Sequence, residues 1–350
     1  MIYELGKIKD ADIKNKMVLL RADLDVPLAN GKISDDMRLQ ASVETIRYLL
    51  GEAKTVIIIG HLGRPDGKDD KFSLKPVAEW IFKQFKLQNS ELRIKDIEGL
   101  MGWEITDKLI LLENLRFYKE EEKNDLDFSQ KLASLAEIYV NDAFASSHRV
   151  HASIVGITKY LPSFAGLRLE KEVQELSKVL ENPKRPLVVI IGGAKIETKL
   201  PLVEKMHHFA DYVLVGGEIA ENDKVLLKVQ HEKITGRKSI LLVADLMGDN
   251  KDITIKSAEN FLQVCQDAGC VVWNGPMGQV ENENYQAGTE ILAKGLSNSK
   301  PYKIVGGGDT IAYLKKINLL EKFDFVSTGG GAMLEFLAGV KLPGLEVLNK

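Results

Sequence analysis

Residues 56–67 read VIIIGHLGRPDG, and this stretch decides the class of fold that the chain can adopt. Four consecutive apolar residues with no polar alternation are typical of a strand that is buried on both faces. The run stops at Gly60 and is followed at once by His61 and Arg64. The stretch therefore predicts a central strand of a parallel sheet, with polar side chains at the end of that strand.

Comparable apolar runs recur along the chain, separated by amphipathic segments such as 37–53 and 75–85, whose apolar residues have helical spacing. This alternation predicts an α/β fold of two Rossmann-like lobes, each with a parallel sheet flanked by helices. The expected strands are 17–24, 55–60, 109–115, 138–144, 186–193, 212–217, 239–246, 270–276, 302–308 and 325–331.

The 350 residues favour two domains over one. A charged amphipathic segment at 166–185 is expected to form a helix that joins the lobes. We expect a first lobe at 1–165, to which 336–350 returns, and a second lobe at 186–335.

Composition limits the classes of partner and the compartment. A formal charge of −3 argues against a broadly basic surface for nucleic acid, although a local cationic pocket is compatible with it. The charged N-terminus and the lack of a long apolar run predict a cytosolic protein without a membrane segment. Cys265 and Cys270 are expected to be reduced core thiols rather than a disulfide framework or a zinc site.

The first half concentrates arginine at the predicted strand ends. Seven of the ten arginines lie at or before Arg149. Arginine matches phosphate and carboxylate oxygens geometrically, so a converging set predicts a site for a small polyanion, whereas any single arginine is more often a solvated surface charge. Asp23 and Asp25 could orient these arginines, accept a ligand hydroxyl, or simply balance charge. The candidates are Arg21, Arg38, His61, Arg64, Arg116, Arg149 and His151.

The second half concentrates glycine at strand ends, in 190–199, 271–278, 304–310 and 327–332. Glycine lets backbone N–H groups approach phosphates closely, and a helix N-terminus favours negative charge, so these turns predict a nucleotide site. No Walker or Gly-x-Gly-x-x-Gly pattern is present. Lys195 and Lys199 are spaced to share one helix face. Asp309 and Thr310 could act either at magnesium and phosphate or as a helix cap.

Two such lobes predict phosphoryl transfer between their ligands. The chain resembles the phosphoglycerate kinase family along nearly its whole length. The resemblance rests on RADLDVPL, GHLGRPDG, LLENLRFYKEEE, YVNDAFASSHRVHAS, IIGGAKIETK, VVWNGPMG, IVGGGDT and STGGGAMLEFLAG, together with DDMRLQASVETI, SFAGLRLEKE and the closing LPGLEVL. It implies reversible transfer from 1,3-bisphosphoglycerate to ADP, by a cytosolic monomer that uses magnesium with ADP or ATP.

The resemblance also implies a role for each candidate. Arg38 and Lys199 would be catalytic. The acid substrate would contact Arg21, Asp23, Asp25, Arg38, His61, Arg64, Arg116 and Arg149. The nucleotide would contact Gly193, Lys195, Lys199, Gly217, Asn274, Pro276, Glu281, Gly307, Gly308, Asp309 and Thr310, with magnesium at Asp309. Helix N-termini at Gly307, Gly330 and Gly331 would offset the charge that develops during transfer.

The chain departs from the family pattern in two places that matter for binding. Between Gly217 and Trp273 it is several tens of residues shorter, in a region that normally helps to enclose the nucleotide base. Asp25 stands where the family usually has asparagine, which adds negative charge beside an anion site. The resemblance therefore implies an active, trimmed kinase; a catalytically weak metabolite-binding or regulatory relative is the alternative.

Overall fold

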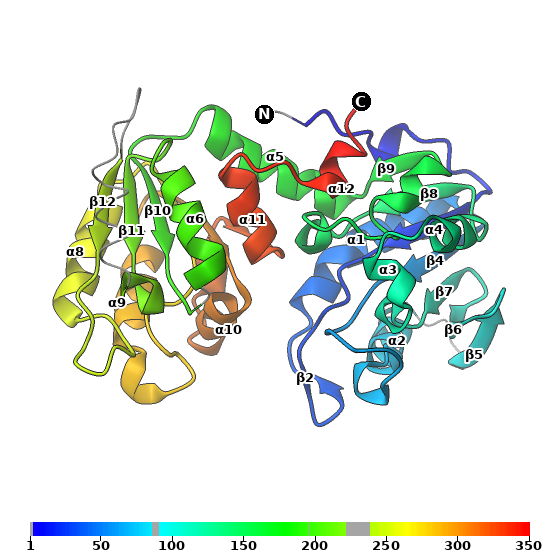
Figure 1. Ribbon diagram of the computed structural model, residues 1–350, viewed down its shortest axis with the longest axis horizontal. Coiled ribbons are helices and arrows are strands. Elements are labelled where there is room, and N and C mark those ends of the chain that lie inside the picture. The colour runs from blue at the N-terminus through cyan, green and yellow to red at the C-terminus, as the bar shows by residue number, and fades with distance from the viewer. Residues whose placement is uncertain (1–2, 86–90, 195, 222–238) are drawn as a thin grey trace. The chain divides into compact units, whose positions relative to one another are not determined.

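A computed structural model describes residues 3–85, 91–194, 196–221 and 239–350 (Figure 1). The chain divides into two compact units. Unit 1 comprises Met1–Gln174 with Lys341–Lys350, and unit 2 comprises Glu175–Val340. Helix α5 (Leu167–Glu181) lies within the segment 166–185, and the division between the units falls within this helix.

Unit 1 is built on a seven-stranded sheet of order β5-β6-β7-β4-β1-β8-β9. The five strands from β7 to β9 are parallel, and β6 and β5 are added antiparallel at one edge. The strand bounds are β1 Met17–Arg21, β4 Thr55–Ile59, β5 Arg93–Ile97, β6 Leu100–Thr106, β7 Leu109–Leu112, β8 Ile138–Asn141 and β9 Ser163–Ala165. A separate hairpin pairs β2 (Leu28–Ala29) with β3 (Lys32–Ile33).

Helices cover both faces of this sheet, which explains the unbroken apolar runs. Alternate strand residues such as Val56 and Ile58 pack with α1 and α2, whereas Ile57 and Ile59 pack with α4 on the opposite face. The helices of unit 1 are α1 Met37–Glu52, α2 Lys75–Phe85, α3 Lys119–Glu122, α4 Leu126–Ala133 and α12 Pro343–Glu346. Its single-turn helices are η1 Ile8–Asp10, η2 Asp70–Phe72, η3 Leu115–Phe117, η4 Phe144–Ser146 and η5 Gly156–Lys159.

Unit 2 contains a fully parallel six-stranded sheet of order β12-β11-β10-β13-β14-β15. The strand bounds are β10 Leu187–Ile191, β11 Tyr212–Val215, β12 Ile240–Val243, β13 Cys270–Asn274, β14 Tyr302–Gly306 and β15 Phe325–Val326. The helices are α6 Ile196–Met206, α8 Ile255–Gln266, α9 Ala287–Ser297, α10 Gly308–Lys316 and α11 Gly330–Leu337, with short turns η6 Gly217–Glu221, η7 Glu283–Tyr285 and η8 Leu320–Lys322. Helices α8 and α9 pack against one face of the sheet, and α6 lies beside β10 (Figure 1).

The predicted α/β fold is confirmed, and each of the ten apolar runs contains a strand. The pattern did not predict the β5–β6 hairpin. Strand β5 carries three charged residues at an exposed edge, so it lacks the apolar run of a buried strand. Cys265 and Cys270 are buried and unbridged, as expected. None of the helices in the described ranges has the length and apolar character needed to cross a membrane.

The last residues of the chain are anchored to the first residues within unit 1. Leu342 N donates to Tyr3 Oη at 3.1 Å, and Gly6 N donates to Leu348 O at 3.0 Å. Leu342, Leu345 and Leu348 are all buried. The C-terminal segment therefore closes the core of unit 1.

We expect removal of 342–350 to destabilise the protein by several kcal/mol, because each buried leucine contributes about 1.5–3 kcal/mol. Chemical denaturation monitored by circular dichroism measures the change. Removing Lys350 alone is the control, since it leaves all three leucines in place. An unchanged unfolding midpoint after the longer truncation would contradict this account.

Candidate active site

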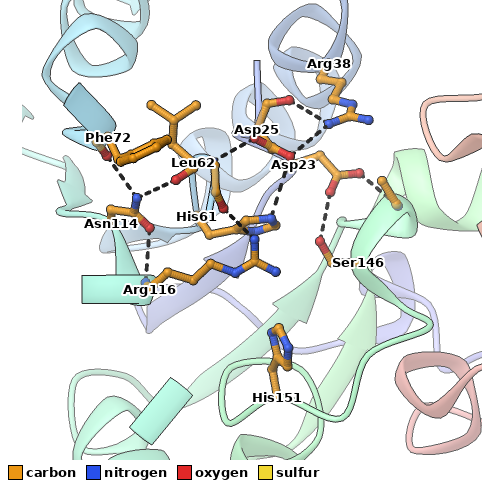
Figure 2. A network of polar contacts seen from close by, with 12 residues as sticks. Asp23, Asp25, Arg38, His61, Leu62, Phe72, Asn114, Arg116, Ser146 and His151 are labelled. Carbon is orange, nitrogen blue, oxygen red and sulfur yellow. Dashed lines mark hydrogen bonds and ion pairs between the residues drawn. The ribbon is translucent and has the colours of Figure 1, made fainter. Parts of the chain in front are cut away.

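The carboxyl ends of β1, β4 and β8 bring a group of basic and acidic side chains together in unit 1 (Figure 2). Strands of a parallel sheet end at the same edge, so residues far apart in sequence converge there. We call this group the basic cluster; it consists of Arg21, Arg38, His61, Arg64, Arg116, His148, Arg149 and His151. Their mutual electrostatic effects show their proximity, since Arg21, Arg116 and Arg149 all lower the pKa of His61 and of His151.

Arg21 lies at the centre of the basic cluster and is fully buried. Its Nε donates to Ser153 Oγ at 3.0 Å, Nη1 donates to Ala22 O at 2.6 Å, and Nη2 lies 2.8 Å from His61 Nδ1. Ser153 Oγ in turn donates to the buried carboxylate of Glu121 at 2.5 Å. These bonds fix the plane of the guanidinium and the orientation of the imidazole.

Arg116 supplies a second buried cation from η3, the turn after β7. Its Nη1 donates to Gly63 O at 2.5 Å, and its Nε lies 3.0 Å from a carboxylate oxygen of Glu122. Nη2 is buried with no hydrogen-bond partner among the described residues. Burial, with Arg149 nearby, lowers the pKa of Arg116 to about 10. A guanidinium with an unused donor among other cations is suited to an anionic ligand.

The histidines of the basic cluster are neutral at physiological pH. Burial and then the neighbouring arginines lower the pKa of His151 to about 3, and burial and Arg149 lower that of His148 to about 4. His61 is shifted well below its ordinary pKa for the same reasons. Imidazoles therefore supply hydrogen-bonding atoms without adding to the crowded positive charge.

The negative charge of Asp25 is compensated by neighbouring groups within the site. Its Oδ1 accepts from Gly63 N at 2.9 Å, and its Oδ2 lies 3.6 Å from Arg38 Nη1 and 3.9 Å from His61 Nε2 (Figure 2). Arg38 Nη1 also donates to Asp25 O at 2.6 Å. The main-chain carbonyl of Asp25 thus holds Arg38, from the first turn of α1, beside the loop that follows β4, and the carboxylate offsets part of its charge.

The side chain of Asp23 is buried, and its carboxylate is hydrogen-bonded to the loop after β8. Its carboxylate accepts from Ala145 N at 3.0 Å and from Ser146 Oγ at 3.4 Å. Burial raises its pKa, and the charges of Arg38 and Arg21 oppose that rise.

Arg64 is exposed and Arg149 is partly buried, so both have side chains near the solvent side of the basic cluster.

In unit 2, the glycine turns that follow β10, β11, β13 and β14 meet through backbone hydrogen bonds. Gly193 N donates to Pro276 O at 2.8 Å, and Gly217 N donates to Met277 O at 3.1 Å. A side chain could not be accommodated at several of these positions. A Cβ on Gly275 would collide with Gly192 O, and one on Gly330 would lie 2.5 Å from Gly307 N. Backbone atoms of 192–193, 216–217, 275–278, 307–308 and 330 line the resulting surface, which we call the glycine floor.

Five of the predicted nucleotide-binding residues line one pocket on the glycine floor: Gly193, Gly217, Pro276, Glu281 and Asp309. Lys199, on α6, donates to Gly192 O at 2.5 Å beside this pocket. Gly308 is the first residue of α10, and Gly330 and Gly331 begin α11. Lys195 lies outside the described residues.

Two predicted ligand contacts are engaged in holding the glycine floor together. Thr310 is fully buried, and its Oγ1 accepts from Gly275 N at 3.0 Å. Asn274 is buried, and its Nδ2 donates to Gly330 O at 2.8 Å. Gly307, with φ 96°, adopts the left-handed backbone that glycine accommodates before α10.

Sequence reasoning missed several residues that shape the two sites. Lys251 and Gln279 line the pocket of unit 2, and Lys251 also lies 5.1 Å from the centre of the Tyr285 ring. Ser153 and Glu121 hold Arg21 in unit 1, and His148 belongs to the basic cluster. A sequence pattern could have identified His148, since 148–151 places two histidines and an arginine after one strand.

The depressed histidine pKa values predict an acid-sensitive cluster. Because His151 has a folded pKa of about 3, the unfolded chain takes up a proton first as pH falls below about 6.5, and stability is lost between these values. We expect His151→Gln to lose less stability than the wild type between pH 7.5 and pH 5, measured by urea denaturation.

The comparison with wild type is needed because buried Asp23 and Glu121 have raised pKa values. Their contribution to the pH dependence of stability has the opposite sign to that of His151. His208→Gln is the control, since that histidine is exposed. If both variants showed the wild-type pH dependence, His151 would not be a neutral buried base.

Comparison with known proteins gives matches along almost the entire chain. The family model described as phosphoglycerate kinase matches residues 8–251 and 221–340. The "Phosphoglycerate kinase 3, cytosolic" of Arabidopsis thaliana is 38% identical over 395 residues, covering 99% of this chain and 98% of that protein. The enzyme of Coprothermobacter proteolyticus is 39% identical over 389 residues, covering 99% of both.

Solved structures agree with these matches. The phosphoglycerate kinase of Coxiella burnetii has a TM-score of 0.77 at 33% identity, and that of Pyrococcus horikoshii OT3 has 0.81 at 30% identity. Each comparison covers 98% of both chains.

The alignments also bear on the length of the second lobe. They extend over 389 to 395 residues although this chain has 350, and the two family-model matches overlap at 221–251. This overlap lies within the stretch that the sequence marks as shortened. With matches over nearly its full length to both sequences and structures, the chain belongs to the phosphoglycerate kinase family.

Proposed function

We propose that this chain transfers a phosphoryl group reversibly from 1,3-bisphosphoglycerate to ADP, giving 3-phosphoglycerate and ATP. Unit 1 would bind the acid substrate and unit 2 the nucleotide. The observation that carries the proposal is the presence of two different anion sites in one family member: a cluster built around two buried arginines in unit 1 and a backbone-lined pocket in unit 2. A protein that only bound one metabolite would need only one of them.

The basic cluster supplies what a phosphorylated acid requires. Arg21 and Arg116 are held by neighbouring carbonyl and hydroxyl groups, so little order is lost when an anion binds. Arg116 Nη2 has an unused donor, and His61 and His151 offer neutral ring nitrogens. Arg64 and Arg149 would complete the contacts from the solvent side.

The chemical step needs alignment and charge neutralisation rather than a general base. An ionised terminal oxygen of ADP attacks the phosphorus of the acyl phosphate, the bond between that phosphorus and the acyl oxygen breaks, and 3-phosphoglycerate leaves as the carboxylate. Negative charge spreads over the transferring group, which positioned cations and helix N-termini stabilise. We assign Arg38 and Lys199 to this role, with the N-termini of α10 and α11.

The residues of unit 2 fit magnesium carried by the nucleotide. No group of three or more metal-ligating side chains occurs within the described part of the chain, whereas Asp309 presents one carboxylate to the pocket. Magnesium is commonly held by one or two carboxylates together with phosphates and water. Bound there, the ion would neutralise phosphate charge, and Asp309 would orient it. Lys199 and the N–H groups of the glycine floor would hold the phosphate oxygens.

We further propose that the enzyme acts as a cytosolic monomer. The support for the compartment is the cytosolic designation of the Arabidopsis relative. The stretch at 221–251, where the two family-model matches overlap, is the part of unit 2 where base recognition would differ most from that of longer relatives.

Substitution of the two transfer residues tests the proposal. We expect Arg38→Ala and Lys199→Ala each to lower kcat by about 100- to 1000-fold in a coupled assay of ATP formation, because each removes a cation from the transferring phosphoryl group. Arg47→Ala on α1 and Lys205→Ala on α6 are the matched controls, since both side chains are exposed. Wild-type turnover no higher than that of Lys199→Ala would favour a metabolite-binding relative.

Asp25 offers a second test, directed at substrate affinity. We expect Asp25→Asn to lower the KM for 3-phosphoglycerate by about two- to tenfold, because it removes a negative charge near Arg38 while keeping an acceptor for Gly63 N. Steady-state kinetics in the ATP-consuming direction measures it. A raised KM would instead mean that the carboxylate is needed to hold Arg38.

A further inference from the structure

A cavity of about 340 Å³ lies in unit 2 at the edge of the sheet opposite the glycine floor. Cys270 and Tyr302 are the first residues of β13 and β14, and they form one side of the cavity. The last turn of α5 and the loop before β10 form the other side. Because the strands are parallel, their amino ends lie at the far edge from the turns that would bind the nucleotide.

The walls of this cavity are held by backbone hydrogen bonds. Gly269 N donates to Pro186 O at 2.9 Å, and Tyr302 N donates to Gly269 O at 3.1 Å. A Cβ on Gly269 would lie 2.6 Å from the carbonyl carbon of Lys184, so the loop before β10 packs directly on the turn before β13. A ligand would therefore meet a preformed cavity and would not have to order the loop.

The lining is largely apolar, and one of its two lysines, Lys184, has no ion-pair partner among the described residues. Val179 and Cys270 are buried, and Pro183 and the Tyr302 ring add carbon surface. Lys178 is paired with Glu175 at 2.8 Å, and Tyr302 Oη donates to the same carboxylate at 2.7 Å. Asp324, the other nearby acid, lies 3.7 Å from Lys303 Nζ. Among the described residues, no ion pair involves Lys184, which is exposed at the rim.

We propose that this cavity binds a small apolar monocarboxylate, with the carbon body against Val179, Pro183 and Tyr302 and the carboxylate at Lys184. The volume lies at the lower end of the range for small-molecule sites, which suits an aromatic or branched aliphatic acid. A dianion would have more charge than the single uncompensated ammonium can match. The Asn182 side chain, also on the rim, offers a hydrogen bond to the second carboxylate oxygen.

The proposal does not depend on the phosphoryl-transfer function, because none of these residues belongs to the basic cluster or the glycine floor. The cavity includes the last turn of α5, the helix within which the two compact units divide. Within unit 2, a bound acid would contact the amino ends of the strands, away from the glycine floor at their carboxyl ends.

Benzoate is the probe for the test, with benzyl alcohol as its uncharged counterpart. We titrate each into the full-length protein and follow backbone amide shifts by NMR spectroscopy. The expected result is a saturable change at 178–184, 270 and 302, with a Kd on the order of 1 mM, as befits so small a ligand. Benzyl alcohol should bind at least about fivefold more weakly, because it lacks the carboxylate.

Lys184→Gln should weaken benzoate about fivefold or more and leave benzyl alcohol unchanged. Lys256→Gln, an exposed lysine on α8, is the matched control and should bind benzoate like the wild type. Both variants replace exposed side chains, so the fold is retained. The proposal is overturned if benzoate causes no saturable shifts at these residues, if it binds no better than benzyl alcohol, or if the two variants lose affinity equally.

Discussion

The buried guanidinium of Arg21 is the constraint on which the arrangement of unit 1 depends. A charge removed from water is stable only when its neighbours satisfy it. Here the partners come from Ala22 directly after β1, from His61 in the loop after β4 and from Ser153 beyond β8. Because these segments are distant in sequence, holding Arg21 also fixes the three loops relative to one another. The geometry of the anion site is thus a consequence of satisfying one buried cation.

The same constraint explains why the cluster uses both arginine and histidine. Three guanidinium groups already act on His61 and His151, so further protonation there would add repulsion in a poorly solvated region. Neutral imidazoles avoid this cost and still offer hydrogen-bonding atoms. Glu121 and Asp25 offset part of the positive charge, and neither removes the unused donor of Arg116. An incoming anion would find the unused Nη2 donor of Arg116 on a guanidinium whose orientation is already set.

The strands and the strand-end residues could be predicted from sequence because each depends on a local pattern. An apolar run such as 56–59 needs burial on both faces, and glycine after a strand permits a tight turn with φ above zero. The partners of Arg21 could not be predicted, since Ser153 lies 132 residues away and carries no distinguishing pattern. The same holds for Thr310, whose hydroxyl meets Gly275 N only because β13 and β14 are neighbours.

The glycine floor imposes a different restriction from that of the basic cluster. Its donors are backbone groups, so their directions depend on how closely the turns approach one another. Gly217 would place a Cβ 2.6 Å from Gly193 N, and Gly275 would place one on Gly192 O. Lys199 now donates to that same Gly192 carbonyl, so a phosphate that recruits the ammonium must compete with a neutral acceptor already in contact. An anionic oxygen forms the stronger hydrogen bond, and the exchange leaves the carbonyl to solvent or to a neighbouring N–H. Lys199 therefore lies beside its proposed ligand, and the negative charge of the phosphate favours exchange of the bond to Gly192 O for a bond to the phosphate.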